Sequence, residues 1–311
     1  MEKHTRKPAY LSIASLAAAG ALLLTACGDG GDPLDEDSGD AGGDPGAVTI
    51  GSADFPESQL IASIYSIALE EAGVEVEENF NIGAREVYIE AVQDGSIDLV
   101  PDYAGALMMH LDSESEATET DEVLAALDEL LPEEGLVRYE AAEAENRNVL
   151  AVTQETAEEY SLETFSDLEP YASDLVLGGP PEWIDRFNGV VGLEEVYGLE
   201  FADFQTLDAG GPLTLTAVTS GQIDVANLFS SDPQVEENDL VVLEDDEALF
   251  AAENITPIIS EDADSDEVAA ALDEVSAALT TEDLMELNQR ASDGENISSI
   301  AEDWLSENDL I

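Results

Sequence analysis

Residues 91–98 read AVQDGSID and residues 217–224 read AVTSGQID, so one short unit occurs twice in the chain. In each copy a helical pattern ends at a glycine, Gly95 or Gly221, and an Ile-Asp pair then begins a strand. The two copies predict that one helix-turn-strand unit is used in two halves of an α/β protein.

An aromatic residue follows each copy at the same distance. Tyr103 lies five residues after Asp98, and Phe229 lies five residues after Asp224. Ligands bind outside the carboxyl ends of the strands in open α/β sheets. Two such ends that face each other would therefore bring both rings to opposite walls of one cleft. Spacing alone leaves a second interpretation open, in which both rings are core aromatics that cap their sheets.

Short apolar runs alternate with helical patterns along the rest of the chain. Val48-Thr49-Ile50 predicts a strand, and the apolar spacing from Leu60 to Ala68 predicts a helix that ends at Gly73. Further strands are expected at 97–100, 149–153, 175–177, 223–226, 240–243 and 255–259. Further helices are expected near 85–93, 120–130, 191–197, 213–219 and 266–279. This alternation over about 265 residues predicts an α/β architecture with two lobes.

The start of the chain has the features of a secretory signal. Three basic residues precede an almost wholly apolar run at 9–24, which ends in Leu24-Thr25-Ala26-Cys27. The run of about 16 residues is shorter than the roughly 20 that span a membrane. We predict a lipoprotein signal peptide at 1–26 and a lipid on Cys27. An ordinary signal peptide that contains a cysteine is the alternative.

The segment after the signal is predicted to be a tether. Residues 27–46 are mostly Gly, Asp, Pro, Ser and Glu, which have too little apolar content to form a packed core. Cys27 is the only cysteine, so the processed chain is expected to have no disulfide and no thiol chemistry. The expected folded lobes are 47–147 plus 253–311 (lobe A) and 148–252 (lobe B).

The composition is strongly acidic but compatible with a globular core. The chain has 73 Asp and Glu against 8 Lys and Arg, a formal net charge of −65, and 44% hydrophobic residues. Such a surface repels itself unless salt screens it, and the screening length falls from about 10 Å at 0.1 M to about 3 Å at 1 M. We infer a halophilic source and expect loss of structure in dilute buffer. No basic stripe is present to bind nucleic acid or another anionic polymer.

Residues that usually carry catalysis are scarce. The two histidines are His4, in the predicted signal, and His110, at the end of an apolar stretch where a packed or solvated histidine is expected. No phosphate-binding glycine loop or metal-ligand cluster stands out. Counting does not exclude a carboxylate-pair hydrolase, because 73 acidic residues produce every spacing by chance. We predict that the chain is not an enzyme and that it uses no metal or cofactor.

Five motifs follow one another along the chain: GSADFPES at 51–58, NIGAREVYIEA at 81–91, DGSIDLVPDYAG at 94–105, GGPPEWIDRFNGVVGLEEVYG at 178–198 and GQIDVANLFSSD at 221–232. Through them residues 47–311 resemble the substrate-binding components of osmoprotectant ABC importers, the ProX/OpuBC (OpuAC-like) family, known for glycine betaine, carnitine and choline. The resemblance implies a type II periplasmic-binding-protein fold. In that fold two α/β lobes, joined by two crossing strands, close on a ligand in the cleft between them.

The resemblance also implies which residues bind ligand. Family members hold a quaternary ammonium in a box of aromatic rings, because ring faces attract a cation by roughly 0.5–2 kcal/mol each. Tyr103 and Phe229 match two rings of that box. Arg186 matches an arginine suited to a betaine carboxylate, although an ion pair on the acidic surface is the alternative for this residue.

The chain departs from the family pattern at two ring positions, where it has Asn148 and Leu215. Phe55 and Trp183 are candidates for other walls of the box, with simple packing as the alternative for each. Ser52 completes the predicted set of ligand-binding residues. With two rings replaced, a polyol, sugar-like or amphiphilic solute is an alternative to the quaternary ammonium.

The sequence therefore predicts a monomeric, lipid-anchored receptor on the extracytoplasmic face of the cell membrane. Its expected partners are a quaternary-ammonium solute, the membrane through the lipid, and the permease and ATPase subunits of an ABC importer. One alternative is a receptor of the same fold for another small solute. The other is an anchored surface protein that binds calcium or a protein through its acidic face.

Overall fold

The computed structural model describes residues 46–311. The predicted signal peptide at 1–26, the lipidation site at Cys27 and the predicted tether up to residue 45 lie outside these described residues. Two five-stranded sheets are formed in the described part of the chain.

The first sheet has the strand order β2-β1-β3-β10-β4. β1 (Val48–Ala53) pairs in parallel with β2 (Val76–Gly83) and β3 (Leu99–Tyr103). β10 (Ile255–Ser260) pairs antiparallel with β3 and with β4 (Leu136–Arg138).

The second sheet repeats this plan in the order β7-β6-β8-β5-β9. β6 (Val176–Gly179) pairs in parallel with β7 (Asp203–Thr206) and β8 (Val225–Phe229). β5 (Asn148–Thr153) pairs antiparallel with β8 and with β9 (Leu240–Val242). The predicted use of one unit in two halves of an α/β protein is confirmed.

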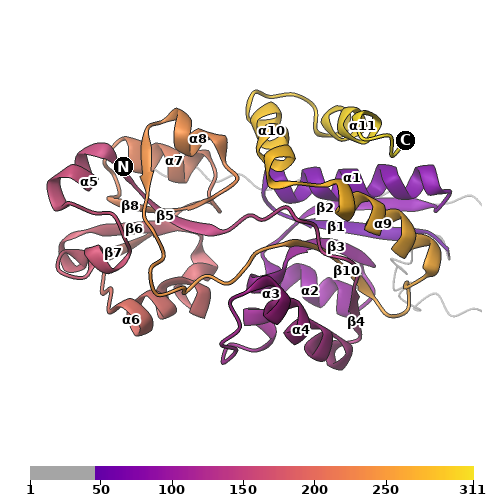
Figure 1. The fold of residues 1–311 in the computed structure, drawn as a ribbon, viewed down its shortest axis with the longest axis horizontal. Helices are drawn as coiled ribbons and strands as arrows, with labels where there is room; N and C mark the ends of the chain where they lie inside the picture. The colour runs from indigo at the N-terminus through magenta and orange to yellow at the C-terminus, as the bar shows by residue number, and fades with distance from the viewer. Residues whose placement is uncertain (1–45) are drawn as a thin grey trace, which may run out of the picture. The chain divides into compact units, whose positions relative to one another are not determined.

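Helices cover both faces of each sheet. The first lobe has α1 (Pro56–Ala72), α2 (Arg85–Gln93), α3 (Ala104–Leu111), α4 (Thr120–Leu130), α9 (Asp266–Ala278), α10 (Thr281–Ser292) and α11 (Ile297–Glu307). The second lobe has α5 (Gln154–Tyr160), α6 (Gly192–Tyr197), α7 (Pro212–Thr219) and α8 (Pro233–Glu237). In the first lobe α1 and α9 lie on one side of the sheet and α2, α3 and α4 on the other (Figure 1).

Each sheet contributes to two hydrophobic cores because successive strand residues point to opposite faces. In β10, Ile259 packs with α1, α9, α10 and α11, whereas its neighbour Ile258 packs with α2, α3 and α4. In β5, Leu150 packs with α5 and α6, whereas Ala151 packs with α7 and α8. The buried faces hold the strand ends in fixed positions, which is what a binding site between the strand ends requires.

The aspartate of each sequence repeat forms hydrogen bonds with the backbone of the neighbouring parallel strand. Asp98 Oδ2 accepts the Thr49 amide at 2.8 Å, and the Asp98 amide donates to the Thr49 carbonyl at 2.7 Å. In the second lobe Asp224 Oδ2 accepts the Val176 amide at 2.8 Å, and the Asp224 amide donates to the Val176 carbonyl at 2.9 Å. The side chain thus completes the hydrogen bonding where β1 and β6 begin, which accounts for the aspartate in both copies.

The glycine of each repeat turns the chain from helix to strand. Gly95, after α2, has φ 78° and Gly221, after α7, has φ 72°. Side chains with a Cβ disfavour this left-handed region, so glycine is the preferred residue at both positions.

The strands and helices predicted from periodicity are confirmed, with differences at their ends. α1 begins at Pro56 rather than near Leu60, because a proline is suited to the first helical position. The pattern missed β2, which reads VEENFNIG: it is an edge strand with a mostly exposed or half-buried surface, and its pairing with β1 stabilises it. It also missed two short strands, β4 and β7, and five helices, namely α3, α5, α8, α10 and α11.

The chain passes from the first sheet to the second between β4 and β5 and returns between β9 and β10. Glu145 and Asn254 form an antiparallel bridge where these two segments run side by side. The lobe boundaries at 147/148 and 252/253 stay predictions.

Candidate functional site

A pocket lies where the carboxyl ends of β3 and β8 meet. β3 ends at Tyr103 and β8 ends at Phe229, and both side chains line this pocket. Residues of both lobes and of the segment before β5 complete the lining. The described structure therefore brings the ends of the two repeated units to one site.

Three aromatic rings form a continuous surface in the pocket. The Phe55 ring lies between the other two, with its centroid 6.0 Å from that of Tyr103 and 5.5 Å from that of Phe229. Phe55 is the N-cap residue of α1 and has an extended backbone. Because Phe229 belongs to the second lobe, the aromatic surface spans both lobes.

Trp183 lines the pocket from the short helical turn at Pro181–Ile184. The residue is only 1% exposed, and its ring stacks on Phe250 with a centroid distance of 6.2 Å and an interplanar angle of 26°. Its ring therefore belongs to the core of the second lobe as well as to the pocket wall.

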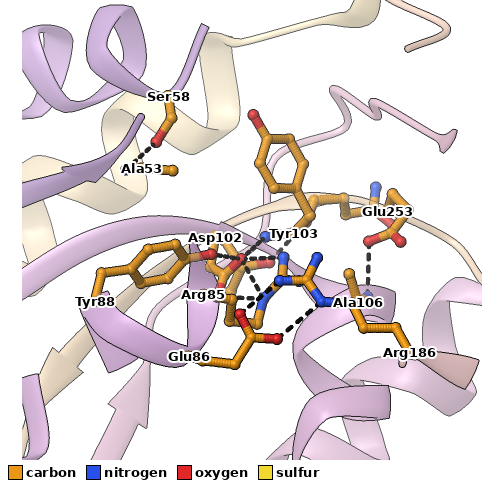
Figure 2. A network of polar contacts seen from close by, with 12 residues as sticks. Ala53, Ser58, Arg85, Glu86, Tyr88, Asp102, Tyr103, Ala106, Arg186 and Glu253 are labelled. Atoms are coloured by element: carbon orange, nitrogen blue, oxygen red, sulfur yellow. Dashed lines mark hydrogen bonds and ion pairs between the residues drawn. The ribbon is translucent and has the colours of Figure 1, made fainter. Parts of the chain in front are cut away.

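Arg186 lines the same pocket and joins the two lobes. Its Nε donates to Glu86 Oε1 at 2.9 Å, and its Nη2 donates to Glu86 Oε2 at 2.7 Å (Figure 2). Burial alone would raise the pKa of Glu86. The hydrogen bonds from Arg186 and from the backbone, together with the positive charges of Arg186 and Arg85, outweigh burial and lower this pKa to about 2. This bidentate ion pair links α2 of the first lobe to the second lobe.

A second arginine of the pocket, Arg85, is buried in the first lobe. Its Nη2 lies 2.7 Å from Asp102 Oδ1, and its Nε lies 3.1 Å from each carboxylate oxygen of Asp102. The Tyr88 hydroxyl donates to the same carboxylate at 2.9 Å (Figure 2). Burial opposes the charge of Arg85, but the Asp102 carboxylate keeps its pKa above the ordinary value. Arg85 is thus a cation fixed by a buried partner.

Arg85 and Arg186 use the same two of their three guanidinium nitrogens to bind carboxylates. Arg85 and Arg186 each contact their carboxylate through Nε and Nη2. Within residues 46–311 neither Nη1 has a protein hydrogen-bond partner. Both residues line the pocket, so each lobe offers guanidinium N–H donors there.

Glu253 is a buried carboxyl group at the wall of the pocket. One of its oxygens accepts the Ala106 amide at 2.9 Å. Burial raises the pKa of Glu253 to about 8. The side chain is therefore mostly protonated at neutral pH and adds little negative charge to the pocket.

Glu57 stands at the centre of a buried hydrogen-bond cluster beside the pocket. Its Oε1 accepts the Tyr103 hydroxyl at 2.6 Å and Asn146 Nδ2 at 2.7 Å, and its Oε2 accepts Asn288 Nδ2 and the Ser231 hydroxyl. We call these five residues the Glu57 cluster. Ser231 lies in the second lobe, whereas Glu57, Tyr103 and Asn288 lie in the first, so the cluster also joins the lobes.

The predicted site residues are distributed as follows. Phe55, Tyr103, Trp183, Arg186 and Phe229 all line the pocket. Ser52 does not line it: its buried hydroxyl donates to the Ala53 carbonyl and accepts the Asn81 amide. Of the two positions where the family rings are replaced, Asn148 lines the pocket, whereas Leu215 packs in the core between α7 and the second sheet.

Sequence reasoning missed four pocket or near-pocket residues, namely Arg85, Glu57, Asn227 and Glu253. Arg85 stands in the second of the five motifs and, as one of the few arginines, carried a usable signal. Glu57 and Glu253 had no such signal, because the sequence does not distinguish two buried acids among 73 acidic residues. Asn227 is a polar residue in the middle of a buried strand, a pattern that indicates a partner or a ligand.

Two further searches cover the described residues only. Within 46–311 no helix has the length and apolar content needed to cross a bilayer. Over the same range no three His, Cys, Asp or Glu side chains are grouped so as to hold a metal ion.

The chain matches a known protein family and is similar to named binding proteins. Residues 46–307 match the family "Substrate binding domain of ABC-type glycine betaine transport system". The carnitine transport binding protein OpuCC of Listeria monocytogenes is 26% identical over 269 residues, covering 84% of this chain and 86% of that protein. The glycine-betaine-binding protein of Pseudomonas aeruginosa is 26% identical over 282 residues, covering 85% and 88%.

The fold is also similar to solved structures. The crystal structure of a glycine betaine/carnitine/choline ABC transporter protein matches with a TM-score of 0.67 at 23% identity, covering 85% of this chain and 99% of that one. This similarity confirms the predicted two-lobed periplasmic-binding-protein fold.

Proposed function

Because the chain belongs to the family of substrate-binding domains of ABC-type glycine betaine transport systems, we propose that it captures a quaternary-ammonium solute in its aromatic pocket. In this proposal the solute is glycine betaine, choline or carnitine. The receptor then delivers it to the transmembrane permease, with which the ATPase subunits of the importer work.

The observation that supports this proposal best is the contact of three rings across the two lobes. Phe55 touches both Tyr103 and Phe229 in one pocket. A trimethylammonium group has no N–H to donate, so ring faces attract it where hydrogen-bond acceptors do less. A cation that contacts rings of both lobes also favours the conformation in which the lobes meet.

The arginines supply hydrogen-bond donors for the carboxylate end of a zwitterionic solute. The free Nη1 groups of Arg85 and Arg186 are donors for a carboxylate such as that of betaine or carnitine. Choline has no carboxylate, so in this proposal only the aromatic rings bind its charged group. The two ligand types are therefore separable by experiment.

The lipid anchor belongs to the same proposal. The signal at 1–26 and the single cysteine, Cys27, support a protein that is acylated at Cys27 and held on the extracytoplasmic face of the membrane. The proposed receptor acts as a monomer, since one chain supplies both walls of the pocket.

The test of the proposal is a ligand panel measured by thermal shift and calorimetry in molar salt. Betaine, choline, carnitine, ectoine and a neutral sugar are compared at equal concentration. Saturable stabilisation by at least one quaternary ammonium compound, and none by the sugar, is the expected result. Stabilisation by the sugar or ectoine alone would instead support a receptor of the same fold for another solute.

A further inference from the structure

Two asparagines lie next to the Phe229 ring on the second sheet. In the antiparallel pair of β5 and β8, Asn148 is opposite Phe229, and Asn227 lies two residues before Phe229 on β8. Side chains two residues apart on a strand share a face, as do directly opposite residues. The two amides and the ring therefore lie on one face, and all three residues line the pocket.

The two amides are bonded to each other but not fully satisfied. Asn227 Nδ2 donates to Asn148 Oδ1 at 2.9 Å. Asn227 is 1% exposed, and its Oδ1 has no hydrogen-bond partner. One bond between two amides always leaves an acceptor on one and a donor on the other. The pair thus offers Asn227 Oδ1 as acceptor and Asn148 Nδ2 as donor beside the ring.

A buried acceptor without a partner is unfavourable unless a ligand supplies a donor. Neither trimethylammonium nor carboxylate can do so, because neither carries an N–H or O–H group. A hydroxyl group can, because it donates one hydrogen bond and accepts another. A hydroxyl on the solute would therefore match both free groups of the amide pair while its cation contacts Phe229.

We infer that the Asn148–Asn227 amide pair binds a hydroxyl group of the solute and makes the pocket selective for hydroxyl-bearing quaternary ammonium compounds. The inference rests on the proposed function and narrows it, from any quaternary ammonium solute to those of the choline and carnitine type.

The experiment uses pairs of ligands that differ by one hydroxyl: choline with ethyltrimethylammonium, and carnitine with γ-butyrobetaine. Dissociation constants are measured by calorimetry for the folded protein in molar salt. The hydroxyl member of at least one pair is expected to bind about 2- to 12-fold more tightly, which is the effect of one net hydrogen bond. Equal affinity within both pairs overturns the inference, and this comparison needs no variant.

Variants then test whether the amide pair causes the preference. Asn227→Leu removes the acceptor at similar size, and Asn148→Ala removes the donor at a half-buried position. Either should bring the ratio of the two affinities close to one. The matched control is Asn254→Leu, because Asn254 also has a bonded Nδ2 and an unpartnered buried Oδ1 but does not line the pocket. Loss of the preference in the control, or its survival in both pocket variants, contradicts the assignment.

The two levels of the proposal fail in different ways. If neither the four compounds nor glycine betaine binds, the proposed function fails and the inference with it. If glycine betaine binds and none of the four does, the proposed function stands and the inference fails. If all four bind with equal affinity inside each pair, the proposed function stands and the amide pair has no role in specificity.

Discussion

The Tyr103 hydroxyl donates to the Glu57 carboxylate, with Oη 2.6 Å from Oε1. The bond connects a ring of the pocket to the Glu57 cluster, whose members come from both lobes and from the segment between them. Burial and the neighbouring Glu57 raise the pKa of Tyr103 well above its ordinary value, so the hydroxyl remains a donor. The orientation of the ring and one of the contacts between the lobes therefore involve the same carboxylate.

Replacing that carboxylate by an amide should destabilise the protein. Glu57→Gln turns one of two acceptor oxygens into a donor, which faces donors of the cluster in either orientation of the amide. We expect a loss of about 1.5–3 kcal/mol in the free energy of unfolding, typical for hydrogen bonds to a buried charged group. Chemical denaturation in molar salt measures it. The control is Glu90→Gln on the exposed surface of α2, and an equal effect of both changes would show that the cluster contributes nothing particular.

The aromatic surface is tested most cleanly at Phe229, whose side chain has no polar group. Phe229→Leu keeps apolar bulk but removes a ring face, so affinity for a quaternary ammonium should fall by roughly 0.5–2 kcal/mol, or about 2- to 30-fold. Tyr103→Leu should cause a similar loss, whereas Tyr103→Phe keeps the ring and should lower stability more than affinity. Tyr171→Leu, outside the pocket, is the control. Wild-type affinity in Phe229→Leu would place the cation elsewhere.

Arg186 has two separable roles. Arg186→Gln should weaken betaine or carnitine by about 1.5–3 kcal/mol relative to choline if its guanidinium binds the carboxylate. Glu86→Gln removes the carboxylate partner but keeps the arginine, so it should affect betaine and choline alike. Titrations of both variants with both ligands distinguish the roles. Equal losses for the two ligands in Arg186→Gln would mean that this arginine joins the lobes without touching the solute.

Glu253 should make stability depend on pH. Its pKa is about 8 in the folded protein against an ordinary value of 4.5. Between these values the folded state holds the proton and the unfolded state releases it, so this contribution is full below the unfolded pKa and disappears as pH rises through 8. Glu253→Gln stays neutral and still offers an oxygen to the Ala106 amide. Its stability relative to wild type should therefore increase from about pH 5 to about pH 9.

Denaturation midpoints at constant high salt test this prediction. The control is Glu261→Gln, at an exposed position, which should follow the wild type at every pH. A constant difference between Glu253→Gln and wild type over the range would mean that Glu253 is ionised in the folded protein.

The anchor is tested by Cys27→Ser. The lipid on Cys27 is the predicted link to the membrane once the signal is removed, so the variant should appear in the medium and not in the membrane fraction. Fractionation followed by immunoblotting measures the distribution. Unchanged membrane retention would refute the lipidation of Cys27.

The sequence by itself determined the repeated architecture. AVQDGSID and AVTSGQID predict the same helix-turn-strand unit because in each a helical pattern ends at a glycine, which a left-handed turn favours. This requirement is local, because the turn is completed within a few residues. For the same reason the positions of Tyr103 and Phe229 at strand ends could be predicted from spacing.

Only the tertiary structure decided which polar residues act together. Glu57 and Ser231 are separated by 174 positions in sequence, and Arg186 and Glu86 by 100, yet each pair is hydrogen-bonded. Composition hides such residues in a chain with 73 acids. Burial distinguishes Glu57 and Glu253 from the exposed acids, and burial follows from the packing of distant segments rather than from local sequence.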